Sequence, residues 1–284
     1  MFIGHFGVAL AAKRLAPRTS LGTLIAGAQF LDLLWPVFLL LGWEHVRVAP
    51  GITKVQALDF YDYPFSHSLT MAVRWSLLFG LAYYIVRRYR RGAWVVGSLV
   101  LSHWVLDFLV HRPDLPLWPG GPKYGLGLWN SWPASISAEV LLFAAGIWLY
   151  SSATRGRDAV GKYGFWSLIA FLFLGWLAAT FGPPPPNVHQ LALGAMAMWL
   201  LVPWAWWADA HRSDLAGLRE ALASYQGIAS AMPQLRPNQT PFRGRGRRSL
   251  PMGRVAQRSD GKPHSGCPIL RGFSRSVGGR LIAP

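Results

Sequence analysis

The stretch AWVVGSLVLSHWVLDFLVH, residues 93–111, reads as a membrane-spanning helix with polar groups on one side. A helix needs about 20 apolar residues to cross a bilayer core about 30 Å thick, and this run has nearly that length. His103, Asp107 and His111 follow one another at intervals of four residues, so they share one helix face. Because an aspartate at the centre of a span costs about 2.5–3.5 kcal/mol, these groups need partners inside the membrane.

Apolar runs of similar length recur along the chain, which has 284 residues, 52% of them hydrophobic and 14% charged. The first twelve residues are too short to span and lack the basic start and cleavage site of a signal peptide, so we expect a short helix there. The sequence predicts an all-α, polytopic membrane protein with this N-terminal helix and about six transmembrane helices, near residues 21–41, 67–86, 93–111, 134–150, 163–181 and 190–208.

Three regions follow from this pattern. We expect a helical transmembrane domain over 1–210, a short amphipathic helix over 211–226 and a basic, disordered tail over 227–284. The tail is rich in Gly, Pro, Ser and Arg and has no apolar periodicity, which favours a solvated segment over a specific nucleic-acid partner. The single cysteine, Cys267, excludes an internal disulfide and a cysteine-based zinc knuckle, so any metal must rest on His and carboxylates.

The loop charges predict an orientation, because Lys and Arg concentrate in cytoplasmic loops. Alternate connections are basic, whereas loops 42–66 and 112–133 mix few basic residues with acidic ones. We therefore place those two loops outside and both termini in the cytoplasm of a bacterial inner membrane. The basic positions are Lys13, Arg14 and Arg18, then the RRYRR run at 87–91, then Arg155, Arg157 and Lys162.

Polar residues from several spans fall at similar depths. His103 lies about 15 Å along its helix from Ala93, near mid-bilayer, and Asp32 lies at a similar depth in its own span. His111 and His67 fall nearer the outer surface. Imidazoles and carboxylates at such positions are common ligands of zinc and related ions. The candidate ligands are His5, Asp32, His67, His103, Asp107 and His111, with Arg74 and Glu139 in the same layer.

Structural roles are the alternative for each residue. Asp32 or Glu139 can pair with Arg74, and an isolated span histidine usually makes a packing hydrogen bond, which is all we expect of His189 and His211.

Four segments resemble a family of bacterial inner-membrane proteins described as membrane-bound metal-dependent hydrolases. They are GHFGVALAAKRL (4–15), AGAQFLDLLWP (26–36), YPFSHSL (63–69) and SHWVLDFLVHRPDLPLWPGGPKYGLGLWNSWP (102–133). The resemblance covers about residues 1–150. The FLD segment carries one acidic residue, Asp32, where the family pattern has two. A site with two metal ions would lack one carboxylate here. The resemblance implies a helical membrane domain that activates water at a metal held by His5, Asp32, His67, His103 and Asp107.

A hydrolase would need a base and a group that stabilises negative charge. Asp107 or Glu139 can serve as the base, with Asp107 preferred as a ligand, and Arg74 or Arg112 can stabilise an oxyanion or hold a phosphate. Membrane lipid surrounds the chain, and a lipid-linked or phosphoester substrate suits the Trp- and Gly-rich loop after His111. An ion- or proton-coupled transporter and a scaffold with a structural metal remain the alternatives.

The charge bias makes a first prediction about topology. Cysteines introduced at Gly51 and Gly121 should react with a membrane-impermeant thiol reagent in intact cells, because both loops face outward. Labelling only after cell lysis would show that the two loops face the cytoplasm and that the predicted orientation is wrong.

Overall fold

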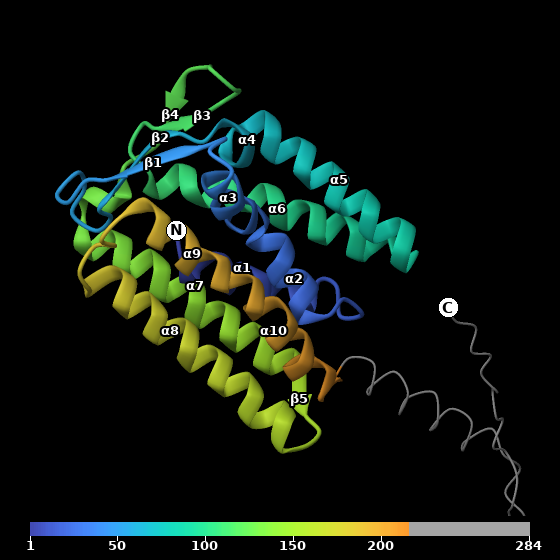
Figure 1. The fold of residues 1–284 in the computed structure, drawn as a ribbon. Helices are drawn as coiled ribbons and strands as arrows, with labels where there is room; N and C mark the ends of the chain where they lie inside the picture. Colours follow the sequence, from blue (N-terminus) through green and yellow to red (C-terminus); the bar gives the residue numbers. More distant parts are fainter. Residues whose placement is uncertain (216–284) are drawn as a thin grey trace, which may run out of the picture. The chain divides into compact units, whose positions relative to one another are not determined.

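The computed structural model describes residues 1–215, and five of its helical segments are long and apolar enough to cross a membrane. Three are continuous α-helices. The fourth begins with a π-helical turn, and the fifth contains a 3-10 turn at its centre. The prediction of a polytopic helical protein is confirmed (Figure 1). The segments are α5 (Leu69–Arg87), α6 (Arg90–Val110), α7 (Trp132–Ala153), η3 (Val160–Gly164) with α8 (Phe165–Phe181), and α9 (Val188–Met196) with η4 (Ala197–Leu200) and α10 (Leu201–Ala210).

The run predicted as one span at 21–41 is a broken helix. It divides into α2 (Leu21–Ala28) and α3 (Phe30–Leu40), which meet at an angle of 59°, and it supplies a sixth span if the pair crosses as one unit. Gln29 forms the break with φ −100° and ψ 8°, outside the α-helical range. A broken helix is tolerated at membrane depth where other groups satisfy the released backbone atoms. Here the side chain of His103 bonds the Ala28 carbonyl.

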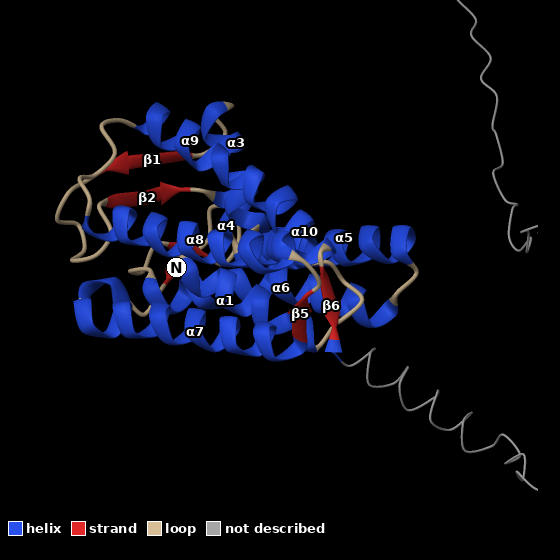
Figure 2. Ribbon diagram, turned by 90° about the horizontal axis from the view of Figure 1, so that it is seen from below, coloured by secondary structure: helices blue, strands red, loops and turns tan. Residues whose placement is uncertain are grey.

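The short N-terminal helix is also present, as α1 (Ile3–Ala11), followed by η1 (Ala12–Arg14). It packs against α7, α2 and α6, and its apolar side chains lie in the buried core (Figure 2). Glycines allow the closest approach to α7, since a Cβ on Gly7 would lie 2.4 Å from the Leu142 carbonyl oxygen. A Cβ on Gly146 would lie 2.2 Å from the Gly7 carbonyl oxygen. Small residues are common where helices meet this closely in membranes.

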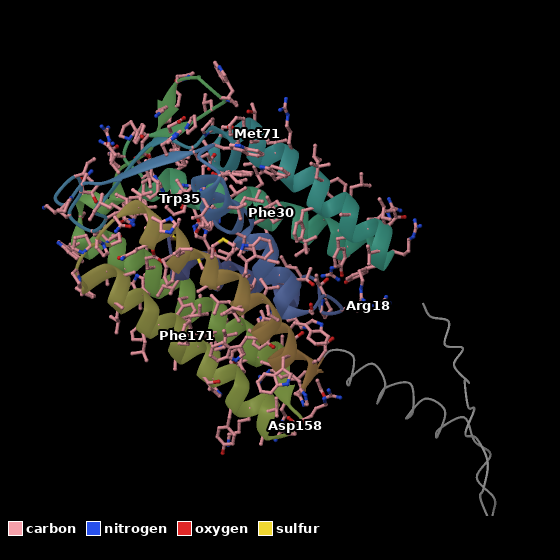
Figure 3. The ribbon with its side chains drawn as sticks, in the orientation of Figure 1. Arg18, Phe30, Trp35, Met71, Asp158 and Phe171 are labelled. Carbon is pink, nitrogen blue, oxygen red and sulfur yellow. The ribbon has the colours of Figure 1, made fainter. Side chains whose placement is uncertain are left out.

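Short pairs of antiparallel strands mark the two ends of the helical bundle. At one end, the hairpin end, β1 (His45–Val48) pairs with β2 (Leu58–Asp62), and β3 (Leu115–Pro116) pairs with β4 (Lys123–Tyr124). The single turn α4 (Pro64–His67) and the 3-10 turn η2 (Leu128–Asn130) lie among these loops. The opposite end carries the basic connections and the pair β5 (Thr154–Gly156) and β6 (Arg212–Asp214). Figure 3 separates the ends, with Met71 at the first and Arg18 and Asp158 at the second.

Strand β6 corrects one expectation. Residues 212–214 form a strand instead of the start of a helix over 211–226, because they pair with β5 and Arg212 bonds the Thr154 and Gly161 carbonyls. The rest of that segment, from 216, and the predicted tail at 227–284 lie outside the described residues.

A buried ionic cluster closes the basic end. Lys13 Nζ lies 2.8 Å from Asp209 Oδ2, the Leu21 amide donates to the same oxygen at 3.0 Å, and the Tyr150 hydroxyl donates to Oδ1 at 2.6 Å. Lys13 also donates to the Thr19 carbonyl at 3.0 Å. Asp209 thereby joins α10 to η1, α2 and α7. Three donors satisfy its carboxylate, which offsets the cost of burying the charge.

Removing that carboxylate should weaken the fold. In Asp209→Ala, Lys13 keeps a buried charge without its counterion, a change that typically costs about 3–5 kcal/mol. We expect a clearly lower thermal unfolding midpoint for the detergent-purified protein. The matched control is Asp158→Ala, which removes an exposed carboxylate paired with His211 at the same end of the bundle and should leave the midpoint unchanged. Equal midpoints for the two variants would show that the Asp209 cluster is not a clamp.

Candidate metal centre

Four of the predicted ligands meet near the hairpin end of the bundle. Asp32 comes from α3, His67 ends α4, and His103 and Asp107 stand one turn apart on α6. His67 Nε2 lies 3.4 Å from Asp32 Oδ1 and 3.7 Å from Asp107 Oδ2. His103 Nε2 lies 3.6 Å from Asp32 Oδ2 and 3.2 Å from Asp107 Oδ2. The break between α2 and α3 and the i, i+4 spacing in α6 together place two carboxylates beside the same two imidazoles.

These separations are close to those of atoms that bind one metal. Zinc bonds of about 2.0–2.1 Å in a tetrahedral shell place neighbouring ligand atoms about 3.3–3.4 Å apart. The four distances above run from 3.2 to 3.7 Å. Two overlapping groups have the spacing of a metal site, Asp32 with His67 and His103, and His5 with His103 and Asp107. The His/Asp group can therefore hold a metal ion.

His103 supports this assignment through its tautomer. Its Nδ1 donates to the Ala28 carbonyl oxygen at 2.7 Å, so Nδ1 carries a proton. Its Nε2 is buried and makes no hydrogen bond within residues 1–215, although carboxylate oxygens lie at 3.2 and 3.6 Å. In the neutral ring Nε2 presents a lone pair to negative oxygens, an arrangement that a bound cation stabilises.

His67 is oriented by the buried carboxylate of Glu44, which was predicted only as one of the charges of loop 42–66. Its Nδ1 contacts Ser66 Oγ at 2.7 Å, and that hydroxyl donates to Glu44 Oε2 at 2.6 Å. The Ser66 hydroxyl has one proton, which it donates in the hydrogen bond to Glu44, so it must accept the hydrogen bond from His67 Nδ1. The proton of the neutral His67 ring is therefore on Nδ1, and Nε2 carries the lone pair that faces Asp32. The Phe65 and Ser66 amides donate to Glu44 Oε1, both at 2.7 Å, while burial raises the pKa of this carboxyl. Glu44 thus fixes the tautomer of a candidate ligand.

His5 lies on the far side of Asp107. Its Nε2 is 3.0 Å from Asp107 Oδ1, and its ring stacks on His103 with centroids 3.8 Å apart. The amino group of Met1 lies 2.5 Å from the same oxygen. The two oxygens of Asp107 are therefore divided, with Oδ1 toward His5 and Oδ2 toward His67 and His103. His5 can complete the second metal group or orient the carboxylate as a hydrogen-bond donor.

His111 lies at the rim of the cluster. Its Nε2 is 3.9 Å from Asp107 Oδ2, and its Nδ1 is 2.9 Å from Asp114 Oδ1. The Tyr63 hydroxyl donates to that same Asp114 oxygen at 3.0 Å, and burial raises the pKa of the tyrosine well above its usual value. Burial lowers the pKa of the His111 imidazole against the opposing effect of Asp114. A neutral His111 that donates through Nδ1 directs the lone pair of Nε2 toward Asp107.

Two residues expected to take part in catalysis, Glu139 and Arg74, make other contacts in the structure. Glu139 accepts the amides of Phe2 and Gly4, at 2.6 and 2.7 Å, and so satisfies the first turn of α1. Arg74 lies on the exposed side of α5, where its Nη1 donates to Met71 Sδ at 3.4 Å. The alternative in which Arg74 pairs with Glu139 or Asp32 is not what the structure shows, because Arg74 lies on an exposed helix face and reaches outward.

The remaining polar candidates lie apart from the four ligands. Arg112 pairs with Asp59 and, at 3.2 Å, with Asp114, so it contacts the cluster only through the partner of His111. His189 is exposed, and His211 pairs with Asp158 at 2.7 Å near the basic end. His211 thus makes the hydrogen bond expected of it, whereas His189 is exposed instead of packed.

A cavity of about 770 Å³ reaches the cluster and includes Asp32, His67, Asp107 and His111 in its wall. A volume of this size is within the range of small-molecule sites, about 300–1,000 Å³. The cluster is therefore buried among side chains but accessible from a space that can admit a ligand.

Comparisons of the chain with protein-family models, curated proteins and solved structures found no match. The fold and the site define a helical membrane protein with a His/Asp cluster that can hold a metal.

Metal content tests the ligand set. After a chelator wash and reloading with zinc, we expect one bound ion per chain in the parent and none in His103→Ala or Asp107→Ala, because each change removes a ligand from a buried site. His111→Ala should have an intermediate effect, because water can replace a ligand at the rim. Elemental analysis gives the count, with insertion verified by detergent extraction.

The controls are His189→Ala and His211→Ala, which remove imidazoles far from the cluster. Both should bind as much zinc as the parent. Full zinc occupancy in His103→Ala and Asp107→Ala would remove the proposed site.

Proposed function

We propose that this chain is a membrane-embedded hydrolase that depends on one divalent metal ion, held by Asp32, His67, His103 and Asp107. The observation that carries the proposal is the pair of imidazoles whose Nδ1 atoms are bonded to Ala28 and Ser66 and whose Nε2 atoms face two carboxylates. Both rings are thus held in the tautomer that ligates metal. A nitrogen and oxygen donor set of this kind suits zinc.

A divalent metal in such a site lowers the pKa of water and polarises a carbonyl or phosphoryl oxygen. The side chain best placed to take the proton from the attacking water is His111. His111 lines the cavity beside the cluster, and Asp114 holds its Nδ1 at 2.9 Å. Asp114 would stabilise the imidazolium that forms after proton transfer. We assign the base role to His111 in place of Glu139, whose two oxygens bind backbone amides.

The location of the polar groups favours hydrolysis over transport. The His/Asp cluster and the Lys13–Asp209 pair lie near opposite ends of the bundle, and buried apolar side chains of α1 and α2 pack between these ends. Phe6, Leu10, Leu24 and Ile25 belong to this layer and are at most 1% exposed. A path for ions or protons would need polar groups or water across that layer.

The resemblance and the loop charges extend the proposal to a location. We assign the chain to a bacterial inner membrane, with the hairpin end and its loops 42–66 and 112–133 outside. In this orientation the Met1 amino group, 2.5 Å from Asp107 Oδ1, lies in the outer half of the bilayer, which disagrees with the expected cytoplasmic N-terminus. The positive-inside tendency supports this orientation, because the basic connections gather at the opposite end. The reaction would then take place in the outer half of the bilayer.

Hydrolysis of chromogenic test compounds examines the proposed activity. The zinc-loaded parent should cleave at least one member of a panel of nitrophenyl esters, phosphomonoesters and phosphodiesters, and the chelator-washed protein should not. His111→Asn should keep part of its zinc and lose about 100- to 10,000-fold in turnover per bound zinc ion, because it lacks a proton acceptor. His189→Asn is the matched control and should retain full turnover.

Full zinc occupancy without turnover of any member of the panel would favour a structural metal. Equal turnover in the parent and His111→Asn would remove His111 from the base role while leaving the metal site intact.

A further inference from the structure

The cavity at the metal cluster extends far beyond the ligands into the membrane-spanning part of the bundle. Its wall continues from the His/Asp cluster along α8 and the α9–η4–α10 segment, and it is mostly apolar there. Leu172 and Trp176 line it from α8, and Leu191, Met198 and Leu201 line it from the opposing segment. The cavity is therefore a polar site at the end of a long apolar slot.

The edge of the slot is exposed at mid-membrane depth. Phe171 of α8 and Leu200 of η4 both line the cavity, and they are 53% and 69% exposed. Each lies near the middle of a segment long enough to span the bilayer, Val160–Phe181 and Val188–Ala210. Figure 3 places Phe171 on α8, the helix that faces α9 and α10 across the slot. Lipid hydrocarbon is the surrounding medium at that depth.

The other end of the cavity reaches the hairpin end. Gln56 and Phe60 of the β1–β2 region and Trp129 of η2 line it there, beside His111. Indole rings are typical of the membrane interface, where lipid headgroups lie. The His/Asp cluster lies between this interfacial end and the apolar slot. The cavity therefore has an interfacial end, then the His/Asp cluster and then an apolar slot. A lipid has a headgroup, then an ester or phosphoester bond and then a hydrocarbon chain, in the same order.

We infer that the cavity binds the hydrocarbon chain of a membrane lipid, whose ester or phosphoester bond then lies at the His/Asp cluster. The inference rests on the proposed function and specifies its substrate class. Water adds across the bond to give an acid and an alcohol, so no further reactant is required. The chain would enter sideways from the bilayer between Phe171 and Leu200, and the slot would contribute binding free energy through burial of apolar surface.

Two glycines in the wall allow the slot to be filled without disturbing the ligands. Gly175 of α8 and Gly194 of α9 both line the cavity, and a Cβ built on either meets no atom within 4 Å. A phenylalanine at either position should therefore project into open space. Ala178 is one turn from Gly175 on α8, exposed and outside the cavity wall, so Ala178→Phe adds a ring to the same helix without filling the slot.

A photoreactive lipid tests the inference in nanodiscs. The probe is a phosphatidylglycerol whose acyl chain ends in a diazirine, and crosslinked peptides are quantified by mass spectrometry. We expect labelling of the peptide that contains Leu201 and Trp204, both in the cavity wall, reduced at least fivefold in Gly175→Phe and in Gly194→Phe. Ala178→Phe should match the parent. Labelling of Leu77 and Leu81, exposed on α5, reports surrounding lipid and should be equal in all variants.

Zinc content and turnover of the small chromogenic compound are measured on the same samples. Reduced cavity labelling with zinc unchanged supports the lipid slot, whether or not the small compound is cleaved. Cavity labelling that stays at the parental level in both glycine variants, or crosslinks confined to outer faces such as that of α5, overturns it. The zinc-free variant His103→Ala should still be labelled in the cavity, so a failed metal site and a failed lipid slot give different results.

Discussion

The hydrogen bond from His103 Nδ1 to the Ala28 carbonyl, 2.7 Å long, connects the path of the chain to the chemistry of the site. A continuous helix would use that carbonyl for its own ladder, but α2 and α3 meet at 59° and His103 bonds it instead. The bond fixes the ring orientation and leaves Nε2 toward the carboxylates. The bend also directs Asp32 to the same point. Helix break and ligand geometry therefore depend on each other.

Burial of the cluster costs folding free energy unless its polar atoms have partners. His103 and Asp107 have side chains only 0% and 3% exposed, so each polar atom that lacks a partner destabilises the fold. The surrounding structure supplies most partners through Ser66, Glu44 and the Ala28 carbonyl. The Nε2 lone pairs of His67 and His103, the oxygens of Asp32 and Oδ2 of Asp107 face one another without a donor from residues 1–215 between them. A bound cation would interact favourably with all of them. Such an arrangement resembles a metal site supported by an outer layer of hydrogen bonds.

The bundle distributes its buried charges between two ends with different properties. At the basic end, the oxygens of Asp209 accept from Lys13, the Leu21 amide and Tyr150. At the hairpin end, His103 Nε2 makes no hydrogen bond within the described residues, and a cavity reaches the cluster. The first arrangement resembles a structural clamp and the second a binding site. Residue types alone do not separate the two, since both combine aspartate with basic groups.

The sequence by itself determined the helical membrane class, because span length and hydropathy follow directly from the apolar runs. It also determined that His103 and Asp107 share a helix face, since the i, i+4 relation is a property of one helix. Depth within each span placed Asp32 and His67 in the same half of the bilayer as His103 and Asp107, because depth along the membrane normal can be compared between separate helices. These predictions depend on local chain geometry and on position along the membrane normal.

Only the tertiary structure decided which residues at that depth meet. Rotation of each helix about its axis is set by packing, which turned Arg74 outward and directed Glu139 to the amides of Phe2 and Gly4. Glu44 was missed because it lies in a loop, and its contact with Ser66 spans 22 residues of sequence. The apolar part of the cavity depends on how far α8 stands from α9 and η4. Hydropathy measures the affinity of a helix for lipid but carries no information about its neighbours, so these features required the assembled bundle.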